Sequence, residues 1–347
     1  MKKLTLLLLV VMVASLFMMG CKEDPVTPPP PPPENKESEI LAKYVEAKGD
    51  YIYTAASFVM TAAAYKTAYL ADTTKVYTID IRAAADYNAK RLKGAVNVTL
   101  ANLYTHIKGL NLANYNQVVV TCYSGQTSAF GLSLVRAMMP TIAEANKILS
   151  LKWGMSSIDS SFATNYWLAK TGNTRATQFI DTDPPAKPAK GAMPVITTGK
   201  TTGAEILEAR VNKLLTDGFN ITIDQATLYS NLSANFIINY WPLAYYKDPG
   251  HIDGAYNYDP VSKPFKYDSV LTTLPINKPV VLYCYTGQTS AYVGAYLKLL
   301  GYEVKSLVWG ANSMIFDKMV ATTVAAFPKT NIFRPTVEIM RYTDLLR

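Results

Sequence analysis

Short apolar runs alternate with longer amphipathic stretches along most of the chain beyond residue 36. The apolar runs are rich in β-branched residues and unbroken by polar ones, which predicts strands buried on both faces, as in a parallel sheet. These strands are expected at 76–80, 118–121, 147–153, 236–240, 280–283 and 303–309. Helices are expected at 37–48, 61–70, 129–139, 204–216, 223–232 and 291–300. This alternation predicts an α/β fold in which helices cover both faces of a mainly parallel sheet.

One stretch of this pattern occurs twice. Val-Val-Val-Thr-Cys-Tyr-Ser-Gly-Gln-Thr-Ser-Ala covers 118–129, and Val-Val-Leu-Tyr-Cys-Tyr-Thr-Gly-Gln-Thr-Ser-Ala covers 280–291. A helical segment that begins Glu-Ile-Leu stands in front of each copy at a similar distance, at 39–41 and 205–207. The repeat predicts two tandem domains that arose by duplication. We expect domain 1 over 37–183, a proline-rich linker over 184–202 and domain 2 over 203–347.

Each copy leads from a strand into a cysteine, a small polar loop and a helix. Gly125 and Gly287 allow a positive φ in the loop. Thr127 or Ser128, and their counterparts Thr289 or Ser290, are candidate caps of the helices that follow. Loop amides beside a helix N-terminus form an anion-binding concavity, in which a thiol ionises more easily and becomes nucleophilic. A small buried core residue is the alternative interpretation of each cysteine, but two matching loops favour a functional one.

The cysteine loop resembles the active-site loop of the rhodanese domain, and other segments of each half fit the same family. Val-Tyr-Thr-Ile-Asp-Ile-Arg at 76–82 resembles the family's hydrophobic strand followed by D-x-R. Gly-His-Ile-Asp-Gly-Ala-Tyr-Asn at 250–257 is similar to its G-H-I-x-G-A-x-N segment, and 91–97 matches that segment with Arg91 in place of the histidine. Trp-Gly pairs at 153–154 and 309–310 stand where the family has Gly-Gly.

The resemblance implies a sulfurtransferase that moves sulfane sulfur through a cysteine persulfide, without a metal or organic cofactor. Thiosulfate or a persulfide would be the small-molecule donor, and a thiol or a cyanide-like compound the acceptor. The nucleophiles would be Cys122 and Cys284. The implied substrate-binding residues are Tyr123, Ser124, Gly125, Gln126, Thr127, Ser128, Tyr285, Thr286, Gly287, Gln288, Thr289, Ser290, Asp80 and Arg82. Phosphatase relatives of the fold have a longer loop that ends in arginine, and neither loop here contains one.

The two halves depart from the family pattern in different ways. Domain 1 keeps Asp80 and Arg82, whereas domain 2 has Asn239 and Trp241 at these positions. Arg82 is either a cation on the substrate side or a partner in a fold-stabilising ion pair. The alternative to an enzyme is a non-catalytic rhodanese-like binding module at the cell envelope, in which the cysteines are relics.

The first 36 residues predict export and anchoring rather than a folded domain. Residues 1–21 combine a basic start, a short apolar run and a Met-Met-Gly-Cys boundary, which is typical of a lipoprotein signal peptide that ends at the lipid-bearing Cys21. Residues 22–36 contain seven prolines, which favour an extended polyproline-type conformation, so this segment is expected to be a stiff tether. The protein is therefore expected in the cell envelope, anchored to a membrane through lipid. Lys22 after the cysteine favours the outer membrane, on its periplasmic or surface face.

Composition narrows the function classes further. The net charge is +8, but Lys and Arg are scattered along the chain, so we expect a solvated basic surface and no nucleic-acid partner. The chain has three cysteines and two histidines, with no Cys-x-x-Cys and no histidine pair, so no metal site is expected. His251 is expected to be structural. Cys122 and Cys284 belong to separate loops and are expected to remain unpaired.

Overall fold

The computed structural model describes residues 36–54, 56–335 and 342–347. The first half is built on a five-stranded sheet in which every neighbouring pair is parallel, in the order β1-β5-β4-β2-β3. Its strands are β1 (Val59–Met60), β2 (Val76–Asp80), β3 (Val96–Asn97), β4 (Gln117–Thr121) and β5 (Ile148–Leu151). The central strand β4 is buried from Val118 onward, as an unbroken apolar run in a parallel sheet should be.

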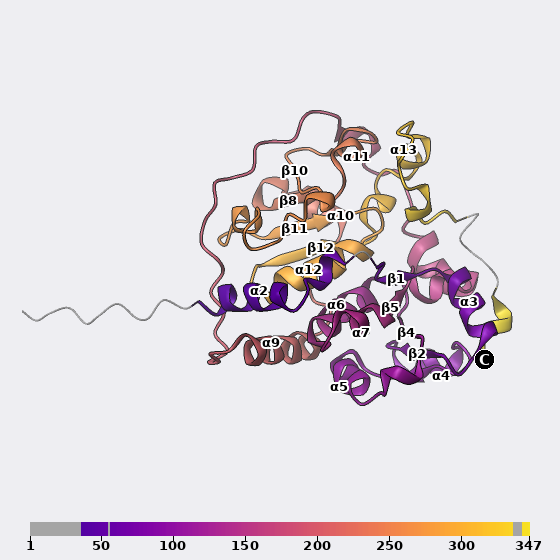
Figure 1. Ribbon diagram of the computed structural model, residues 1–347. Helices are drawn as coiled ribbons and strands as arrows, with labels where there is room; N and C mark the ends of the chain where they lie inside the picture. Colours follow the sequence, from indigo (N-terminus) through magenta and orange to yellow (C-terminus); the bar gives the residue numbers. More distant parts are fainter. Residues whose placement is uncertain (1–35, 55, 336–341) are drawn as a thin grey trace, which may run out of the picture. The chain divides into compact units, whose positions relative to one another are not determined.

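Helices connect the strands of the first half and cover its sheet (Figure 1). The α-helices are α3 (Ala62–Ala71), α4 (Ala84–Ala89), α5 (Leu103–Lys108), α6 (Gln126–Met138), α7 (Ile142–Lys147) and α8 (Ser160–Ala163). Thr61 caps α3 by accepting a hydrogen bond from the Ala64 amide at 3.2 Å. Helix α6 directly follows the first cysteine loop, and its buried side chains join the largest hydrophobic core.

The second half repeats this plan. Its five strands are also parallel, in the order β10-β8-β11-β12-β7. They are β7 (Thr222–Ile223), β8 (Phe236–Asn239), β10 (Tyr256–Asn257), β11 (Val280–Tyr283) and β12 (Val304–Leu307). Its helices are α9 (Gly203–Asp217), α10 (Gln225–Ser230), α11 (Leu243–Lys247), α12 (Gln288–Leu299) and α13 (Phe316–Ala321). Two sheets with the same strand order confirm the predicted tandem α/β architecture.

The two halves pack closely through the helices that follow the cysteine loops. Helices α6 and α12 lie against each other, and their side chains belong to one hydrophobic cluster. Helix α2 (Glu37–Ala47) precedes the first half in sequence but packs against α9, and the Ser38 hydroxyl donates to the Leu300 carbonyl at 2.7 Å. The described residues from 36 onward therefore form one compact unit.

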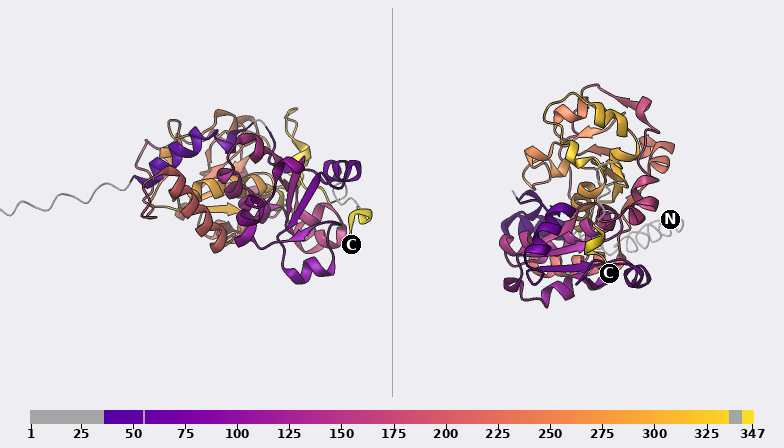
Figure 2. Two further views of the ribbon diagram at one scale, coloured as in Figure 1. Left: turned by 60° about the horizontal axis from the view of Figure 1, so that its bottom comes forward. Right: turned by 90° about the vertical axis from the view of Figure 1, so that its right-hand side faces the viewer.

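A short segment that follows each half in sequence pairs with the other half, and we call these two segments the exchanged arms. The first arm is β6 (Phe179–Ile180), which pairs antiparallel with β9 (His251–Ile252) in the second half. The second arm is Leu345–Arg347, whose Leu346 forms an antiparallel bridge with Leu92 in the first half. Figures 1 and 2 both show the yellow end of the chain beside this half. Leu92 and Ile252 occupy equivalent positions of the repeat, so the exchange is reciprocal.

The predicted positions of several strands are confirmed. The strands β2, β4, β8 and β11 lie where the apolar runs placed them. Helix α9 ends at Gly218, its C-cap, with φ +80°. The helices α6 and α12 begin three residues earlier than predicted, at Gln126 and Gln288. Their N-caps are Gly125 and Gly287, and neither makes a side-chain capping bond. The prediction that a loop threonine or serine caps each helix is therefore wrong.

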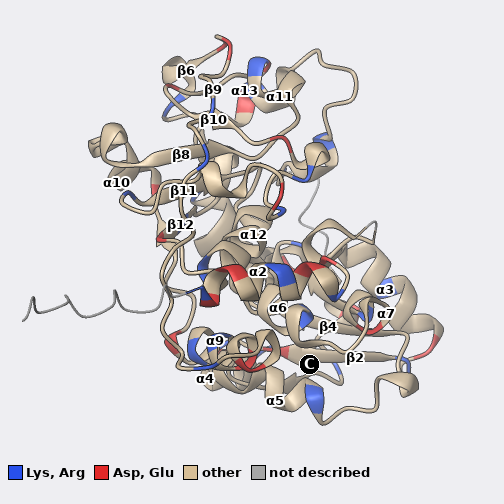
Figure 3. Cartoon of the chain, turned by 60° about the vertical axis from the view of Figure 1, so that its left-hand side comes forward, with Lys and Arg blue, Asp and Glu red and all other residues tan. Residues whose placement is uncertain are grey.

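Charged side chains are spread over the described surface rather than gathered by sign. Figure 3 shows Lys and Arg interspersed with Asp and Glu on the elements of both halves. This distribution agrees with the expected solvated basic surface. In the described residues, no helix combines the length and the apolar character that crossing a membrane requires. The predicted signal peptide (1–21), Cys21 and nearly all of the tether (22–36) lie outside the described residues.

Candidate active site

Cys122 lies between the end of β4 and the start of α6, at the carboxyl edge of the first sheet. Its side chain is 2% exposed. Two backbone amides point at its sulfur, with the Gly125 nitrogen 3.1 Å and the Ser128 nitrogen 3.4 Å from Sγ. The hydroxyl of Ser128 lies at 3.4 Å from the same sulfur. Backbone N–H groups that converge on one atom favour negative charge there, so the loop is arranged to hold an anionic sulfur.

The loop takes this shape because its carbonyls are occupied on the opposite side. The carbonyls of Cys122 and Tyr123 accept hydrogen bonds from the amides of Met155 at 2.8 Å and Ser156 at 3.2 Å. Gly125 turns the chain with φ +88°, and a Cβ there would come within 2.8 Å of the Trp153 nitrogen. Only glycine fits both demands. With the carbonyls directed away, the N–H groups of the loop face the sulfur.

Ser128 has a different role from the predicted cap. It lies in the first turn of α6, fully buried, and its hydroxyl is 3.1 Å from the Gly125 carbonyl and 2.8 Å from the Ser150 hydroxyl. Thr127, the other predicted cap, is only partly buried. The loop residue Ser124 accepts a hydrogen bond from the Gln126 amide at 3.4 Å.

Cys284 repeats this arrangement with weaker contacts. It is also 2% exposed, and the Ser290 amide lies 3.4 Å and the Ser290 hydroxyl 3.7 Å from its sulfur. Within the described residues, the Gly287 amide makes no hydrogen bond to Sγ that would match the one from Gly125. Ser290 contacts Ser306 at 2.9 Å, as Ser128 contacts Ser150. Thr286 is buried and Thr289 is partly exposed, like their counterparts in the first loop. Both cysteines are free thiols.

The two loops contact each other through an exchange of glutamines. Gln288 of the second loop accepts a hydrogen bond from the Trp153 amide at 3.2 Å and donates to the Ser150 hydroxyl at 3.0 Å. Gln126 of the first loop accepts one from the Trp309 amide at 3.2 Å. Trp153 and Trp309 have φ of +62° and +66°, a left-handed conformation that costs energy for a side chain of this size. Each half therefore helps to hold a strained turn of the other.

Asp80 and Arg82 form a buried ion pair at the end of β2. The guanidinium donates to the carboxylate through Nε at 3.0 Å and through Nη2 at 2.7 Å, and the two side chains are 0% and 1% exposed. The second Nη2 contact goes to the Lys90 carbonyl at 2.8 Å. This geometry favours the fold-stabilising alternative for Arg82. The substrate-binding role suggested for the pair stays a prediction.

The equivalent place in the second half contains no charged pair. The Asn239 amide donates to the Tyr283 hydroxyl at 2.9 Å. Trp241 is fully buried, stacks on Tyr285 with ring centroids 4.9 Å apart, and has an indole N–H without a hydrogen-bond partner in the described residues. An aromatic ring thus takes the place of the guanidinium.

The tyrosine after each cysteine lies in a different environment. Tyr123 stacks on Tyr166 at 4.8 Å and donates a short hydrogen bond to Asp86. Burial, together with that hydrogen bond, raises the pKa of Tyr123 to about 12. Tyr285 contacts Trp241 and Phe327, and burial raises its pKa as well. Both phenols are therefore neutral near pH 7 and act as ring surfaces rather than as bases.

His251 has the structural role that the sequence predicted. Its Nδ1 lies 3.0 Å from the Tyr246 carbonyl, its ring stacks on the Tyr246 ring, and it is 1% exposed. Burial lowers the pKa of this imidazole. In the part of the chain that the structure describes, no group of three or more His, Cys, Asp or Glu side chains could hold a metal ion.

Sequence reasoning missed the residues that support the loops from neighbouring strands. Ser150 and Ser306 are fully buried in β5 and β12 and contact the loop serines. Asp86 and Tyr166 support Tyr123 from α4 and from the segment after α8. A signal for the two strand serines was present, because each is the third residue of its strand, at the same position of the repeat.

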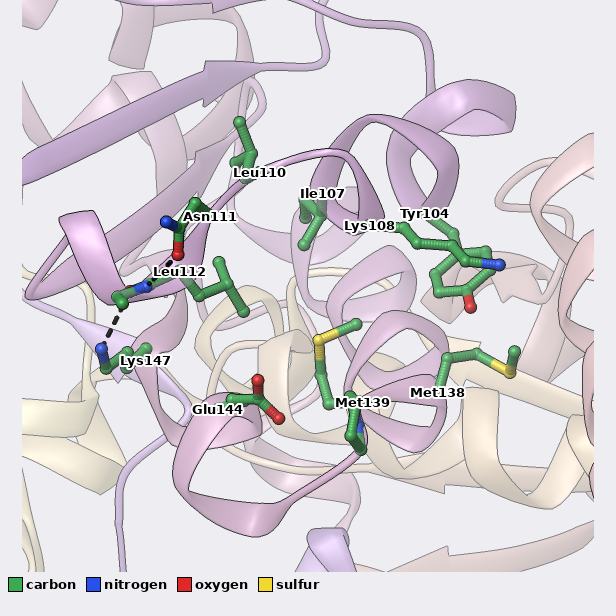
Figure 4. Close-up of a pocket in the computed structure, with 12 residues that line it drawn as sticks. Tyr104, Ile107, Lys108, Leu110, Asn111, Leu112, Met138, Met139, Glu144 and Lys147 are labelled. Carbon is green, nitrogen blue, oxygen red and sulfur yellow. Dashed lines mark hydrogen bonds between the residues drawn. The ribbon is translucent and has the colours of Figure 1, made fainter.

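The large cavities of the described chain lie away from the cysteines. Figure 4 shows one of about 400 Å³ between α5 and α7, into which Ile107, Met139 and Leu112 project. Neither cysteine lines it. Smaller hollows lie beside the strained turns, one of about 220 Å³ at Trp153 and one of about 370 Å³ at Trp309. Access to each sulfur therefore depends on the loop and the aromatic rings next to it.

Comparison with solved structures finds several similar chains. A rhodanese-related protein from Thermoplasma volcanium is 22% identical and matches over 28% of this chain and 91% of its own, with a TM-score of 0.25. Thiosulfate sulfurtransferase from Pseudomonas aeruginosa is 17% identical over 78% of this chain and 45% of its own (TM-score 0.27). 3-Mercaptopyruvate sulfurtransferase from Leishmania major is 12% identical over 74% of this chain and 73% of its own (TM-score 0.26). No curated protein sequence matched the chain.

A family model matches both halves of the chain. The model of the rhodanese-like domain matches residues 61–161 and 225–314, which together make up more than half of the chain. The two matches fall on the two parallel sheets, and each contains one of the cysteine loops. The chain therefore belongs to the rhodanese-like domain family and carries two copies of the domain.

Proposed function

We propose that the protein is a sulfurtransferase that carries sulfane sulfur as a persulfide on its loop cysteines. The observation that carries this proposal is the pair of backbone amides, from Gly125 and Ser128, within 3.4 Å of the Cys122 sulfur. Such donors stabilise a thiolate before the reaction and an anionic sulfur after it. Family membership supports the same reaction class.

The reaction balances without an added oxidant or reductant. The Cys122 thiolate attacks the outer sulfur of thiosulfate, a new S–S bond forms to the cysteine, and the old S–S bond breaks with release of sulfite. An acceptor thiolate or cyanide then attacks the outer sulfur of the persulfide. This step restores the cysteine thiolate and leaves the acceptor as a persulfide or thiocyanate. The loop contributes nucleophilic catalysis and charge stabilisation, and no cofactor takes part.

The surroundings support different donors for the two halves. Around the first loop lie Arg82, 5.7 Å from the Tyr123 ring centroid, and the polar pair of Tyr123 with Asp86. Around the second loop lie Trp241, Tyr285 and Phe327. A charged donor such as thiosulfate is better matched to the first loop, because two backbone amides point at its sulfur. An organic persulfide or polysulfide is better matched to the aromatic one.

A non-catalytic binding module is the second candidate, and the burial of both sulfurs favours it. Each cysteine is only 2% exposed, so a donor must displace part of the surrounding structure to reach it. In this alternative, the rhodanese-like halves would bind a partner or ligand at the cell envelope, and the thiols would take no part.

Intact-mass spectrometry distinguishes the two candidates. Purified protein is incubated with thiosulfate, and separately with glutathione persulfide, and the mass is recorded before and after addition of a thiol reductant. The enzyme hypothesis expects a gain of one sulfur atom that the reductant reverses. It also expects no such gain in the Cys122→Ser/Cys284→Ser double variant. A wild-type protein that gains no sulfur from either donor would leave the binding module as the better description.

We further propose that the protein is anchored in the outer membrane of the cell envelope, through lipid on Cys21. The support is the sequence alone: the apolar run ends at Met-Met-Gly-Cys, and Lys22 follows. The Cys21→Ala variant is expected to lose the lipid and to leave the detergent phase in phase partitioning. A Cys21→Ala protein that is processed and stays with the membrane would contradict the lipid anchor.

A further inference from the structure

A chain of hydrogen bonds connects the second cysteine loop to the sulfur of the first. It begins at Gln288, four residues after Cys284, whose amide nitrogen donates to the Ser150 hydroxyl at 3.0 Å. Ser150 contacts the Ser128 hydroxyl at 2.8 Å, and that hydroxyl lies 3.4 Å from the Cys122 sulfur. All four side chains are nearly or fully buried, so water does not compete for these contacts.

The orientation of the Gln288 amide is fixed by backbone groups on both sides. Its oxygen faces the Trp153 N–H at 3.2 Å, and its nitrogen faces the Leu151 carbonyl at 3.3 Å. A flipped amide would place donor against donor and acceptor against acceptor. The nitrogen therefore donates to Ser150, and the Ser150 oxygen accepts.

The fixed Gln288 donor determines which of the two serine hydroxyls donates a hydrogen bond to the other. The Ser150 oxygen accepts a hydrogen bond from Gln288, so the Ser150 hydroxyl proton is free to be donated. Ser128 is its acceptor, because the described residues provide no other acceptor for this proton. Ser128 then has its proton available for one of two acceptors, the Gly125 carbonyl at 3.1 Å or the Cys122 sulfur. When Cys122 is a thiol, its proton points at Ser128 and Ser128 bonds to the carbonyl. When Cys122 loses its proton to solvent, the Ser128 hydroxyl can turn to the anionic sulfur.

In the second half, no such donor fixes the direction of the hydrogen bond between the two serines. Ser306 contacts Ser290, but Gln126 does not reach Ser306, because its amide nitrogen bonds to Ser124 in its own loop at 3.4 Å. The Ser306 hydroxyl can thus act as donor or as acceptor. Two cysteine loops that differ in sequence only at Ser124 and Thr286 therefore give an asymmetric network.

We infer that Gln288 is a positioning residue for the chemistry of Cys122: through Ser150 and Ser128, the second loop directs a hydroxyl donor at the nucleophile of the first. The inference deepens the proposed function. It rests on that function only for what the network is used for, because the network acts on the Cys122 thiol whether or not sulfur is transferred. The charged and titratable groups around the first loop are Asp80, Arg82, Asp86, Tyr123 and Tyr166, and none of them belongs to the network.

The test measures thiol ionisation at each cysteine separately. The full chain is alkylated with iodoacetamide over a pH series, and the rate at the Cys122 and Cys284 peptides is followed by mass spectrometry. Gln288→Met removes the donor while nearly keeping the side-chain length, and Gln225→Met is the matched control, because it removes a glutamine that bonds to the Ser313 carbonyl outside both cysteine loops. Gln288→Met is expected to raise the alkylation midpoint of Cys122 by about half to one pH unit, the effect of losing one hydrogen bond. Gln225→Met is expected to shift neither midpoint.

A second variant protects the test against damage to the fold. Ser150→Ala interrupts the network but leaves the bond between Gln288 and Trp153, and it should move the Cys122 midpoint in the same direction. The inference is overturned if folded Gln288→Met and Ser150→Ala proteins keep the wild-type Cys122 midpoint, or if Gln225→Met shifts it equally. A Cys122-specific shift in a protein that forms no persulfide would support the inference and overturn only the proposed function.

Discussion

At the end of β2 the first half carries Asp80 and Arg82 as a buried ion pair, whereas the second half carries Asn239 and a buried Trp241 at the end of β8. The cysteine loops next to them are nearly identical in sequence and in backbone shape. Even so, the first sulfur has two amide donors and a directed hydroxyl, and the second has one amide donor at 3.4 Å. The comparison teaches that the loop sequence determines the shape of the pocket, while residues outside it determine the electrostatics.

The largest expected difference between the halves concerns stability. Arg82→Ala leaves the Asp80 carboxylate buried without its partner, which should lower the free energy of unfolding by about 3–5 kcal/mol. Asn239→Ala removes a neutral amide from the matching place and should cost only about 1–2 kcal/mol. Urea denaturation followed by circular dichroism measures both. Equal losses would mean that the ion pair is no more important than the neutral contacts that replace it.

The exchanged arms offer the second test. Leu345 and Phe179 are both buried, and each packs against the half to which it does not belong in sequence. Leu345→Ala should lower the free energy of unfolding by about 2–4 kcal/mol, the cost of a cavity in a packed core. Phe179→Ala should cost at least as much, since it removes more buried surface. Thermal unfolding of the two variants measures the effect, with the exposed Leu70→Ala as a control that is expected to change little. A Leu345→Ala protein as stable as this control would show that the second arm contributes nothing.

A smaller difference is expected in catalysis. Cys122→Ser should lose about ten times more thiosulfate-dependent transfer than Cys284→Ser, because one additional hydrogen bond to a charged sulfur is worth about 1.5 kcal/mol. With an organic persulfide as donor, Cys284→Ser should show the larger loss, because its loop lies among aromatic rings. Initial rates of both variants with both donors decide the matter. The same ratio with each donor would contradict a division of labour.

The smallest expected effect concerns pH. The second half has the buried His251 where the first half has Arg91. Burial lowers the pKa of His251 in the folded protein, so below the unfolded-state value of 6.5 the unfolded chain binds more protons than the folded one. Its contribution to stability is therefore fully present above that pH and declines as the pH falls toward the folded-state pKa. The urea midpoint of wild type should decrease from about pH 7.5 to about pH 5.5 more than that of His251→Gln. Parallel profiles for the two proteins would contradict this assignment.

Most of the fold was predictable because it follows from local patterns. The apolar runs identified β2, β4, β8 and β11, and the repeated loop indicated two equivalent domains. The glycines marked the turn that aims amides at each sulfur. Glycine as the N-cap of α6 and α12 was missed, because serine and threonine are better caps in isolation. Here the serine is held instead by Ser150, a contact between elements that no local pattern reveals.

The asymmetry of the site could not be predicted for the same reason. Gln126 and Gln288 lie in loops that differ only at Ser124 and Thr286, yet their amide nitrogens bond to different partners. The second exchanged arm connects Leu92 with Leu346, two residues far apart in the sequence. The role of Arg82 was equally ambiguous in the sequence, because only the observed distances show that its guanidinium bonds to Asp80. Long-range contacts of this kind depend on how the completed halves pack.

The second exchanged arm has a consequence for the order of synthesis. The segment that completes the first half, Leu345–Arg347, follows the whole of the second sheet in the sequence. At roughly 5–20 residues per second, the first half is synthesised roughly ten to thirty seconds before this segment. Throughout this interval the site around Leu92 remains uncovered. The first half therefore reaches its native state only after the second half has been synthesised.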